Sequence, residues 1–438
     1  MRRFPERPPI ARPILRATLF VLLCLVGYVS RGVPPAHANG RLPGAGQIAR
    51  DPAHPELAAV RTTFGLLWSQ DAGHTWRWVC ESGATYADVT DPFLLFADAR
   101  LVLATSTGLA AATDPCSFAH VEGPFGQRPA IDLSRRAADA KTLWALTQDQ
   151  PGPRLSRSLD GGLSWADVGP PLPGAPSDTM APYAQTLDVA PSNPQRLYAT
   201  GLVQQLGQSL LWRSDDGGQS WVMRPLPGPG GAVDFLGAID PQDANRLYLR
   251  RLRDGGGSVW QSSDGGESWQ QLWSNERIPA GLALSPDGAV LAVATPARVS
   301  DKSPGDLWRI TLATGQVEHR PGWGGTCLSW AVDGLWQCGA ESLDGFTVAR
   351  IVGGERQIVL HAKDVQPLDC APDTRTGKLC PEVWQAVAPK LQSLPLPKPP
   401  SPPAAEGGCR APRVRTGDIG WTLLALLGCS LACRRRRR

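Results

Sequence analysis

The 438-residue sequence lacks the short motifs that identify several classes of enzyme. It contains no GxSxG nucleophile elbow, no HExxH zinc motif, no Walker loop and no GxGxxG after a strand. No two cysteines have CxxC spacing, and the five histidines beyond residue 38 are scattered singly. Only three methionines are present, and aromatic residues other than tryptophan are few, so nothing indicates an adaptable hydrophobic groove. We therefore expect no metal ion and no cofactor.

Regular helical patterning is also missing. No segment keeps the 3.6-residue period of a helix for more than a few turns. Instead, apolar runs of about four to six residues are separated by Gly, Pro, Asn and Asp. This pattern predicts short β-strands joined by tight turns.

The sequence does contain one eight-residue phrase, SxDxGxxW, four times, at 69–76, 158–165, 214–221 and 262–269. Self-similarity at a period of roughly 20 to 50 residues is typical of a repeat fold. The fixed positions of the four copies are Ser69, Asp71, Gly73 and Trp76; Ser158, Asp160, Gly162 and Trp165; Ser214, Asp216, Gly218 and Trp221; and Ser262, Asp264, Gly266 and Trp269.

The distances between the copies give the size of the repeat. The four aspartates are 89, 56 and 48 residues apart, and the long first gap holds a decayed copy in which Asp114 and Phe118 replace the Asp and the Trp. The steps then become 43, 46, 56 and 48 residues. A second phrase, an apolar pair followed by a turn and an LYAT-like strand, recurs seven times, and the last two copies have no Asp phrase.

Units of about 40 to 50 residues with about four strands are typical of a propeller blade, which avoids exposed sheet edges by closing a ring. We therefore predict an all-β fold, a β-propeller over residues 39–386 with seven blades of four antiparallel strands. Six or eight blades are the alternatives.

Each Asp phrase has a structural role in such a blade. The carboxylate can accept backbone N–H groups of the turn that follows, and the Gly at the fifth position supplies a positive φ. The Ser hydrogen-bonds locally, and the Trp packs the turn against the blade. Metal ligation is the weaker interpretation, because a calcium loop needs several more oxygen ligands at fixed offsets.

The phrase resembles the Asp box, or BNR repeat, of sialidases, sortilin-type receptors and photosystem II assembly factors. The resemblance implies the propeller fold but no particular activity, since that family mixes enzymes with binding proteins. Sialidases of this kind carry an Arg triad, an Asp acid/base, a Tyr nucleophile with a Glu partner and an RIP motif before the first box. Here the RIP at 277–279 follows the fourth box, and Tyr198 and Tyr248 occupy the repeated strand, where we expect core residues.

The N-terminal end of the chain predicts export. Residues 1–38 combine six arginines, a 13-residue apolar run at 17–29 and a small-residue AHA, as in a secretory signal peptide with cleavage after Ala38. The apolar run is short for a membrane span of about 20 residues.

The C-terminal end predicts anchoring. Residues 387–408 form a Pro-rich linker, and residues 409–438 contain Cys409, a short apolar helix and five terminal arginines. This segment resembles the MYXO-CTERM sorting signal of myxobacterial and related surface proteins, which implies cleavage of the tail and anchoring through Cys409. The alternative is an unprocessed membrane anchor with the arginines inside. Both place the domain outside the cytoplasm, at the cell surface or outer membrane of a Gram-negative bacterium.

Six cysteines lie within the propeller region, and an even number in an exported domain implies disulfides rather than zinc. Six cysteines allow fifteen pairings. We expect sequential local pairs: Cys80 with Cys116, Cys327 with Cys338, and Cys370 with Cys380.

The basic character of the chain belongs to its ends. The formal charge is +4 for the whole sequence, but residues 39–409 hold 30 Lys and Arg against 38 Asp and Glu, or −8. This acidic balance argues against nucleic acid as a partner.

Loops on a rigid scaffold are where function concentrates, so we place the ligand surface on an insertion at 169–185 and a polar stretch at 202–209. Residues 380–391 are expected to form a short closing helix. The expected function is a monomeric, surface-anchored, non-catalytic binding or assembly module for a protein or glycan. The alternatives are a sialidase-like or other glycoside hydrolase and a chaperone for membrane complexes.

Overall fold

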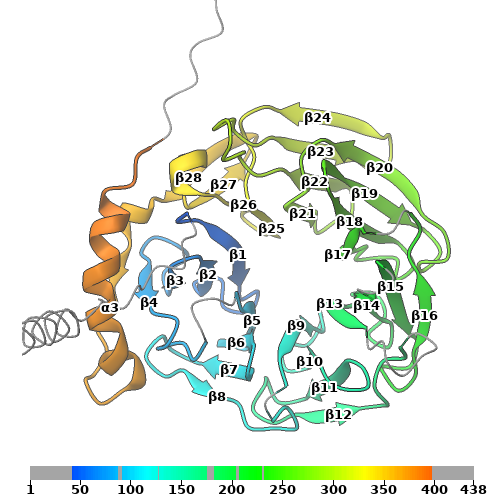
Figure 1. Ribbon diagram of the computed structural model, residues 1–438, viewed down its shortest axis with the longest axis horizontal. Helices are drawn as coiled ribbons and strands as arrows, with labels where there is room; N and C mark the ends of the chain where they lie inside the picture. Colours follow the sequence, from blue (N-terminus) through cyan, green and yellow to red (C-terminus); the bar gives the residue numbers. More distant parts are fainter. Residues whose placement is uncertain are drawn as a thin grey trace, which may run out of the picture. The chain divides into compact units, whose positions relative to one another are not determined.

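The protein is a ring of seven four-stranded blades (Figure 1). The computed structural model describes residues 42–86, 91–126, 128–174, 182–203, 207–228 and 231–396. Each blade is an antiparallel meander, and its strands are named A to D from the centre outward. The prediction of a seven-bladed all-β propeller is confirmed, and the alternatives of six and eight blades are wrong. The signal peptide with Ala38 and the C-terminal segment with Cys409 lie outside the described residues.

The blades follow the chain in order. Blades 1 to 3 comprise β1 (Ala45–Arg50), β2 (Ala58–Thr62), β3 (Gly65–Ser69), β4 (Arg77–Val79), β5 (Phe93–Ala97), β6 (Arg100–Thr105), β7 (Gly108–Ala112), β8 (Ala119–His120), β9 (Ala130–Arg135), β10 (Leu143–Thr147), β11 (Arg154–Ser158) and β12 (Ala166–Val168). Blades 4 and 5 comprise β13 (Tyr183–Val189), β14 (Leu197–Val203), β15 (Gln208–Ser214), β16 (Val222–Pro225), β17 (Val233–Ile239), β18 (Leu247–Arg253), β19 (Gly256–Ser262) and β20 (Gln270–Asn275). Blades 6 and 7 comprise β21 (Gly281–Leu284), β22 (Val290–Ala294), β23 (Leu307–Thr311), β24 (Gln316–Arg320), β25 (Cys327–Ala331), β26 (Gly334–Cys338), β27 (Val348–Val352) and β28 (Glu355–Leu360).

The apolar core lies between the faces of adjacent blades. Tyr198 and Tyr248 are fully buried in the second strands of blades 4 and 5, as expected for core residues. Between blades 5 and 6, Trp273 and Trp308 pack edge to face with ring centroids 5.0 Å apart. Each fully buried large apolar side chain of this kind contributes roughly 1.5 to 3 kcal/mol relative to an exposed one.

Blades 7 and 1 meet without exchanging a strand. The backbone N–H of Ala45 donates to the carbonyl of Gly339 at 3.0 Å. Arg50 of blade 1 donates to both carboxylate oxygens of Asp333 in blade 7 at 2.9 and 2.8 Å. Arg350 reaches the same carboxylate at 3.1 Å, so this ion pair network joins the first and last blades.

The C-terminal segment returns to blade 1. In blade 7, the short α2 (Glu341–Asp344) separates β26 from β27, and after β28 the chain forms η2 (Ala362–Asp364) and β29 (Gln366–Pro367). β29 pairs in parallel with β4, and α3 (Arg375–Gln392) follows with Trp384 packed against Trp78 at 5.2 Å between ring centroids. The closing helix was expected at 380–391 and begins earlier, because Thr374 accepts from the backbone N–H of Gly377 as its N-cap.

All six cysteines of the propeller region form disulfides, but two of the expected pairs are wrong. The bonds are Cys80–Cys380, Cys116–Cys370 and Cys327–Cys338. Cys327 and Cys338 are register partners on adjacent strands, as expected. The other two bonds tie the C-terminal segment to blades 1 and 2, because ring closure brings the two ends of the domain together. Three disulfides are typical of a protein that folds in an oxidising compartment. No helix among the described residues is long and apolar enough to cross a membrane.

Candidate functional site

The antiparallel strands divide the turns between two faces of the ring. The A–B and C–D turns lie on one face, here called the box face. The B–C turns and the D–A links between blades lie on the other, here called the loop face. All four Asp phrases are C–D turns, at β3–β4, β11–β12, β15–β16 and β19–β20. The end of β12 and the start of β13, like the end of β14 and the start of β15, lie on the loop face.

The Asp phrase at 158–165 shows the hydrogen bonding of these turns. The hydroxyl of Ser158 donates to Asp160 Oδ1 at 2.7 Å and accepts from the N–H of Gly162 at 2.9 Å. The backbone N–H of Ser164 donates to Asp160 Oδ1 at 2.9 Å, and its hydroxyl donates to Oδ2 at 2.5 Å. Gly162 has a φ of +86°. These contacts link the two sides of the turn around a single carboxylate.

The other three phrases repeat this geometry. The Ser hydroxyl donates to the Asp carboxylate at 2.8 Å in each, and the fifth-position glycines all have φ between +91° and +96°. Hydrogen bonds from the seventh-position Ser and its backbone lower the pKa of Asp160, Asp216 and Asp264 to about 2. Burial opposes the change at Asp71, but hydrogen bonds from Thr75 and Ser69 still lower its pKa. These aspartates are therefore ionised and engaged within their own turns.

The decayed copy is the C–D turn of blade 2, where the sequence placed it. Asp114 accepts the N–H of Cys116 at 2.9 Å, and Cys116 is bonded to Cys370. Phe118 is buried and packs edge to face on Trp68 of blade 1, with ring centroids 5.9 Å apart. A disulfide and an aromatic contact thus accompany the shortened box.

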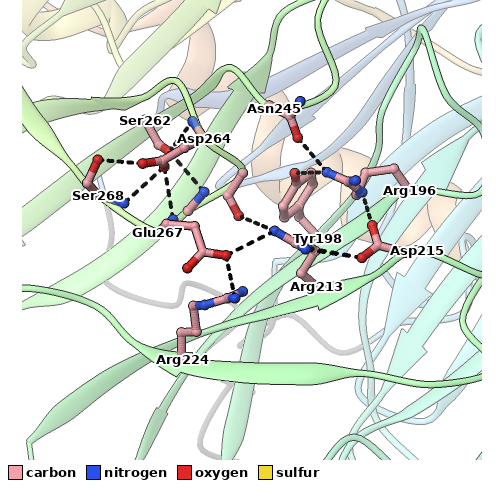
Figure 2. Close-up of polar contacts among 12 residues, drawn as sticks. Arg196, Tyr198, Arg213, Asp215, Arg224, Asn245, Ser262, Asp264, Glu267 and Ser268 are labelled. Carbon is pink, nitrogen blue, oxygen red and sulfur yellow. Dashed lines mark hydrogen bonds and ion pairs between the residues drawn. The ribbon is translucent and has the colours of Figure 1, made fainter.

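The phrase of blade 5 also binds blade 4 (Figure 2). Glu267 is at the sixth position of the phrase. Its carboxylate accepts a hydrogen bond from the guanidinium of Arg224 at 2.5 Å and lies 3.5 Å from the guanidinium of Arg213. Arg213 also donates to Asp215 of the preceding phrase at 3.2 Å. Figure 2 therefore shows three Arg, Tyr198 and a Glu in one cluster, but each arginine has a carboxylate partner and the phenol of Tyr198 donates to the carbonyl of Ala244 at 2.9 Å.

Two carboxylic acids lie on neighbouring inner strands of the ring. Asp132 in β9 is buried and accepts the N–H groups of Leu133 and Leu187 at 2.9 and 2.8 Å. Burial raises its pKa to about 7 despite those hydrogen bonds. Asp188 in β13 lines a hollow of 370 Å³ formed by the inner strands of blades 4 to 7, together with Trp330. Burial, and then the charge of Asp132, raise the pKa of Asp188 well above its usual range.

Towards the loop face, the inner part of the ring carries positive charge. Arg250 of β18 lies over the ring of Phe235 at 4.8 Å and donates to the backbone carbonyl of Ala280. Burial lowers its pKa to about 10, and the charge of Arg61 from blade 1 acts in the same direction. Carbonyl partners orient this guanidinium without neutralising it.

The largest of the hollows described here lies on the loop face between blades 5 and 6. It has a volume of 660 Å³ and is called the arginine hollow; its lining residues are Arg253, Gly255, Ser274, Asn275, Glu276, Arg277 and Arg298. Arg253 ends the second strand of blade 5, and Gly255 lies in the B–C turn that follows it. Residues 274–277 end its outer strand and begin the D–A link, and Arg298 comes from the B–C segment of blade 6.

Sequence reasoning placed the ligand surface elsewhere on the same face. Residues 175–181 of the expected insertion and 204–206 of the polar stretch lie outside the described residues. Two signals for the arginine hollow were visible in the sequence: the displaced RIP begins with Arg277, and the glycine-rich turn at 254–257 supplies Gly255. Neither signal showed that the two segments meet, because one precedes β19 and the other follows β20 in the sequence.

Within the described ranges, no group of three or more His, Cys, Asp or Glu side chains is arranged to hold a metal ion. Among the described residues, the inner carboxylic acids and the arginine hollow are two candidate sites.

Comparisons with known proteins show the fold. The chain matches no protein-family model and no curated protein. An ancestral GH74 enzyme is similar in structure, with 14% identity and a TM-score of 0.50 over 72% of this chain and 46% of that one. A puromycin-hydrolysing peptidase of Mycobacterium tuberculosis shares 14% identity, with a TM-score of 0.49 over 76% of this chain and 55% of that one. The Cps50 (Swd1) propeller domain of Myceliophteria thermophila shares 10%, with a TM-score of 0.45 over 72% and 95%. The chain spans less than half of the GH74 enzyme's length, and at this identity the likeness defines a propeller and no activity.

Proposed function

We propose that the protein is an exported, non-catalytic binding module that takes its ligand on the loop face. The arginine hollow carries this proposal, because it gathers three arginines and only one carboxylate on a domain of net negative charge. Binding sites concentrate on loops presented by a rigid scaffold, and the interlocked blades provide one. The box face, by contrast, uses its polar groups for contacts between and within blades.

The proposal includes the fate of both ends. Cleavage after Ala38 releases the domain from its leader, and processing at Cys409 anchors it to the surface through the 387–408 spacer. The disulfides support folding outside the cytoplasm. The propeller acts as a monomer towards a protein or glycan ligand, without nucleic acid. Mass spectrometry of the mature C-terminus tests the anchoring part, and an intact tail at 434–438 would contradict processing.

A glycoside hydrolase is the competing function, and one observation favours it. Asp132 and Asp188 lie on adjacent inner strands, and burial raises the pKa of both. Glycosidases of the two common classes need a protonated carboxylic acid and an ionised carboxylate on either side of the scissile bond. Both oxygens of Asp132, however, accept backbone N–H groups: one from Leu133 of its own strand, and one from Leu187, which joins blade 3 to blade 4.

A hydrolysis screen separates the two functions. The purified mature protein is incubated with fluorogenic sialosides and related glycosides, beside the variants Asp132→Asn and Asp188→Asn. We expect no turnover by any of the three proteins. Turnover by the wild-type protein that either substitution abolishes, in a variant with an unchanged melting temperature, would overturn the binding-module proposal.

A further inference from the structure

We propose that the arginine hollow binds an anionic glycan, with acidic groups on the arginines and a sugar ring beside Trp260. This inference rests on the proposed function and names its ligand class. The site lies at the rim between blades 4, 5 and 6, away from the inner carboxylic acids.

The arginine side chains are oriented but incompletely neutralised. Arg277 donates to the hydroxyl of Ser303 at 2.7 Å and to the carbonyl of Pro304, and neither partner carries charge. The side chain of Asn275 accepts the backbone N–H of Arg277 at 2.9 Å, which fixes the start of the D–A link. The side chain of Arg253 is exposed and makes no hydrogen bond or ion pair within the described part of the chain. Two planar guanidinium groups are thus available for bidentate contacts with carboxylate or sulfate.

The acidic groups around the hollow are Glu276, Asp301 and Asp254, which follows Arg253 in the chain. Glu276 is the one carboxylate in the lining. Asp301 lies 3.5 Å from Arg298 and also accepts the hydroxyl of Ser303 at 2.6 Å. The charges of Arg298 and Arg277 both act on Asp301, so its carboxylate is shared between them. Within the lining, three arginines still face one carboxylate. An anion is the ligand that this balance attracts.

A second hollow adjoins the first and indicates a sugar. It has a volume of 330 Å³, shares Arg253 with the arginine hollow, and is lined by Trp260, Ser258 and Gln271, among others. Trp260 is half-buried, and its indole N–H donates to the hydroxyl of Ser258 at 2.8 Å, which fixes the ring. Gln271 is exposed beside it on the paired strand. An aromatic face next to an amide suits a sugar ring, which presents C–H groups on one side and hydroxyls at its edge.

The buried pair below this second hollow keeps Trp260 in place. Arg251 makes a bidentate contact with Asp234 at 2.7 and 2.9 Å, and its guanidinium lies 5.2 Å from the centre of the Trp260 ring. Arg251 is thereby neutralised, so it contributes position and not an anion contact. The acidic group of the ligand must therefore be bound by Arg253 and Arg277.

Binding to a panel of polymers tests the inference. The purified mature protein is titrated with polygalacturonate, which carries carboxylates on sugar rings; dextran sulfate, which carries sulfates; neutral dextran; and poly-L-glutamate, which carries carboxylates without sugars. We expect binding to one or both anionic polysaccharides, weakened by salt, and about tenfold weaker binding to neutral dextran and poly-L-glutamate. The first two polymers distinguish a carboxylate from a sulfate.

Matched variants locate the site. Arg253→Ala and Arg277→Ala are each expected to weaken binding about tenfold, Arg277→Lys is expected to lie between Arg277→Ala and wild type, and Gln271→Ala is expected to weaken polysaccharide binding. Arg246→Ala is the control, because Arg246 belongs to the same blade but to an A–B turn on the box face. It removes the same charge and is expected to leave binding unchanged. Melting temperatures of all variants exclude misfolding.

The outcomes separate this inference from the proposed function. Equal binding of poly-L-glutamate would overturn the glycan part, and equal binding of neutral dextran would overturn the anionic part. If Arg246→Ala weakened binding as much as Arg277→Ala does, the binding site would not be the arginine hollow. Failure of all four polymers overturns the inference alone, whereas turnover in the hydrolysis screen overturns the proposed function.

Discussion

Removing the two long-range disulfides should destabilise the protein more than additively. Cys80–Cys380 and Cys116–Cys370 enclose nested loops with sequence separations of 300 and 254 residues. When one bond is removed, the other still holds the unfolded chain, so the loop that opens is only the difference of 46 residues. The entropy of closing the large loop is lost only when the second bond is removed as well.

The chain-entropy relation gives the magnitudes. Opening a loop of about 46 residues corresponds to about 4 kcal/mol, and opening a loop of about 254 residues corresponds to about 5.5 kcal/mol at 25 °C. Each double-cysteine variant, Cys80→Ser with Cys380→Ser or Cys116→Ser with Cys370→Ser, should therefore lose about 4 kcal/mol of unfolding free energy. The variant without both bonds should lose about 9.5 kcal/mol, an excess of about 1.5 kcal/mol over the sum of the two.

Guanidinium unfolding under oxidising conditions measures these losses, with a stabilising osmolyte present so that the weakest variant remains folded. Cys327–Cys338 provides the control, since it joins adjacent strands over 11 residues and lies in blade 7. Removing this bond should lower the free energy of unfolding by about 3 kcal/mol. When it is combined with the removal of either long-range bond, the two losses should simply add. A combined loss equal to or below the sum of the two long-range variants would refute the nested-loop argument.

Three further changes have defined outcomes. Burial raises the pKa of Asp132 to about 7, so the contribution of this carboxylic acid to stability is greatest below pH 4 and is lost as the pH rises towards 7. The melting temperature of the wild-type protein should fall over that range, and Asp132→Asn should make this fall smaller. Ser164→Ala removes the hydroxyl hydrogen bond that contributes most to lowering the pKa of Asp160 to about 2, while the backbone N–H of residue 164 still donates to the carboxylate. The stability that is present above pH 4 and lost in acid should then be lost at a higher pH, as circular dichroism can measure. Gly218→Ala should lower the free energy of unfolding by about 1 to 3 kcal/mol, because the added Cβ lies 2.2 Å from a methyl of Leu155. Gly161 also has a positive φ, but no atom lies within 4 Å of an added Cβ, so Gly161→Ala should lower it less.

The sequence predicted those parts of the fold that depend on local chemistry. Asp71 and its three equivalents mark C–D turns because each turn needs a carboxylate, a hydroxyl and a glycine within five residues. Asp114 marks a further C–D turn through its carboxylate alone, since this shortened copy has neither the first-position serine nor the glycine. Cys370 and Cys380 were paired wrongly because local spacing carries no information about ring closure. The partners of these two cysteines are 254 and 300 residues away and were set by the return of the chain to blades 1 and 2.

The arginine hollow was missed for a related reason. Arg253 and Arg277 belong to segments that look like ordinary turns when each is considered alone, and their charges gather only because the β19–β20 hairpin returns the chain to the same face. The insertion at 169–185 was chosen because it was long. Length is visible in a sequence, but the convergence of charges from separate turns is not.

Individual arginines of the two faces differ in how their charges are used, although the loop face also holds paired arginines such as Arg154 with Asp149. On the box face, Arg50 and Arg350 meet Asp333 where blade 7 joins blade 1, and Arg213 and Arg224 meet Glu267 where blade 4 joins blade 5. On the loop face, Arg277 has a hydroxyl and a carbonyl as partners, and Arg250 has carbonyls. Arginines that join blades need acidic partners within the protein, whereas arginines that bind a ligand must keep their charge available. These contacts support the proposal that the ligand binds on the loop face.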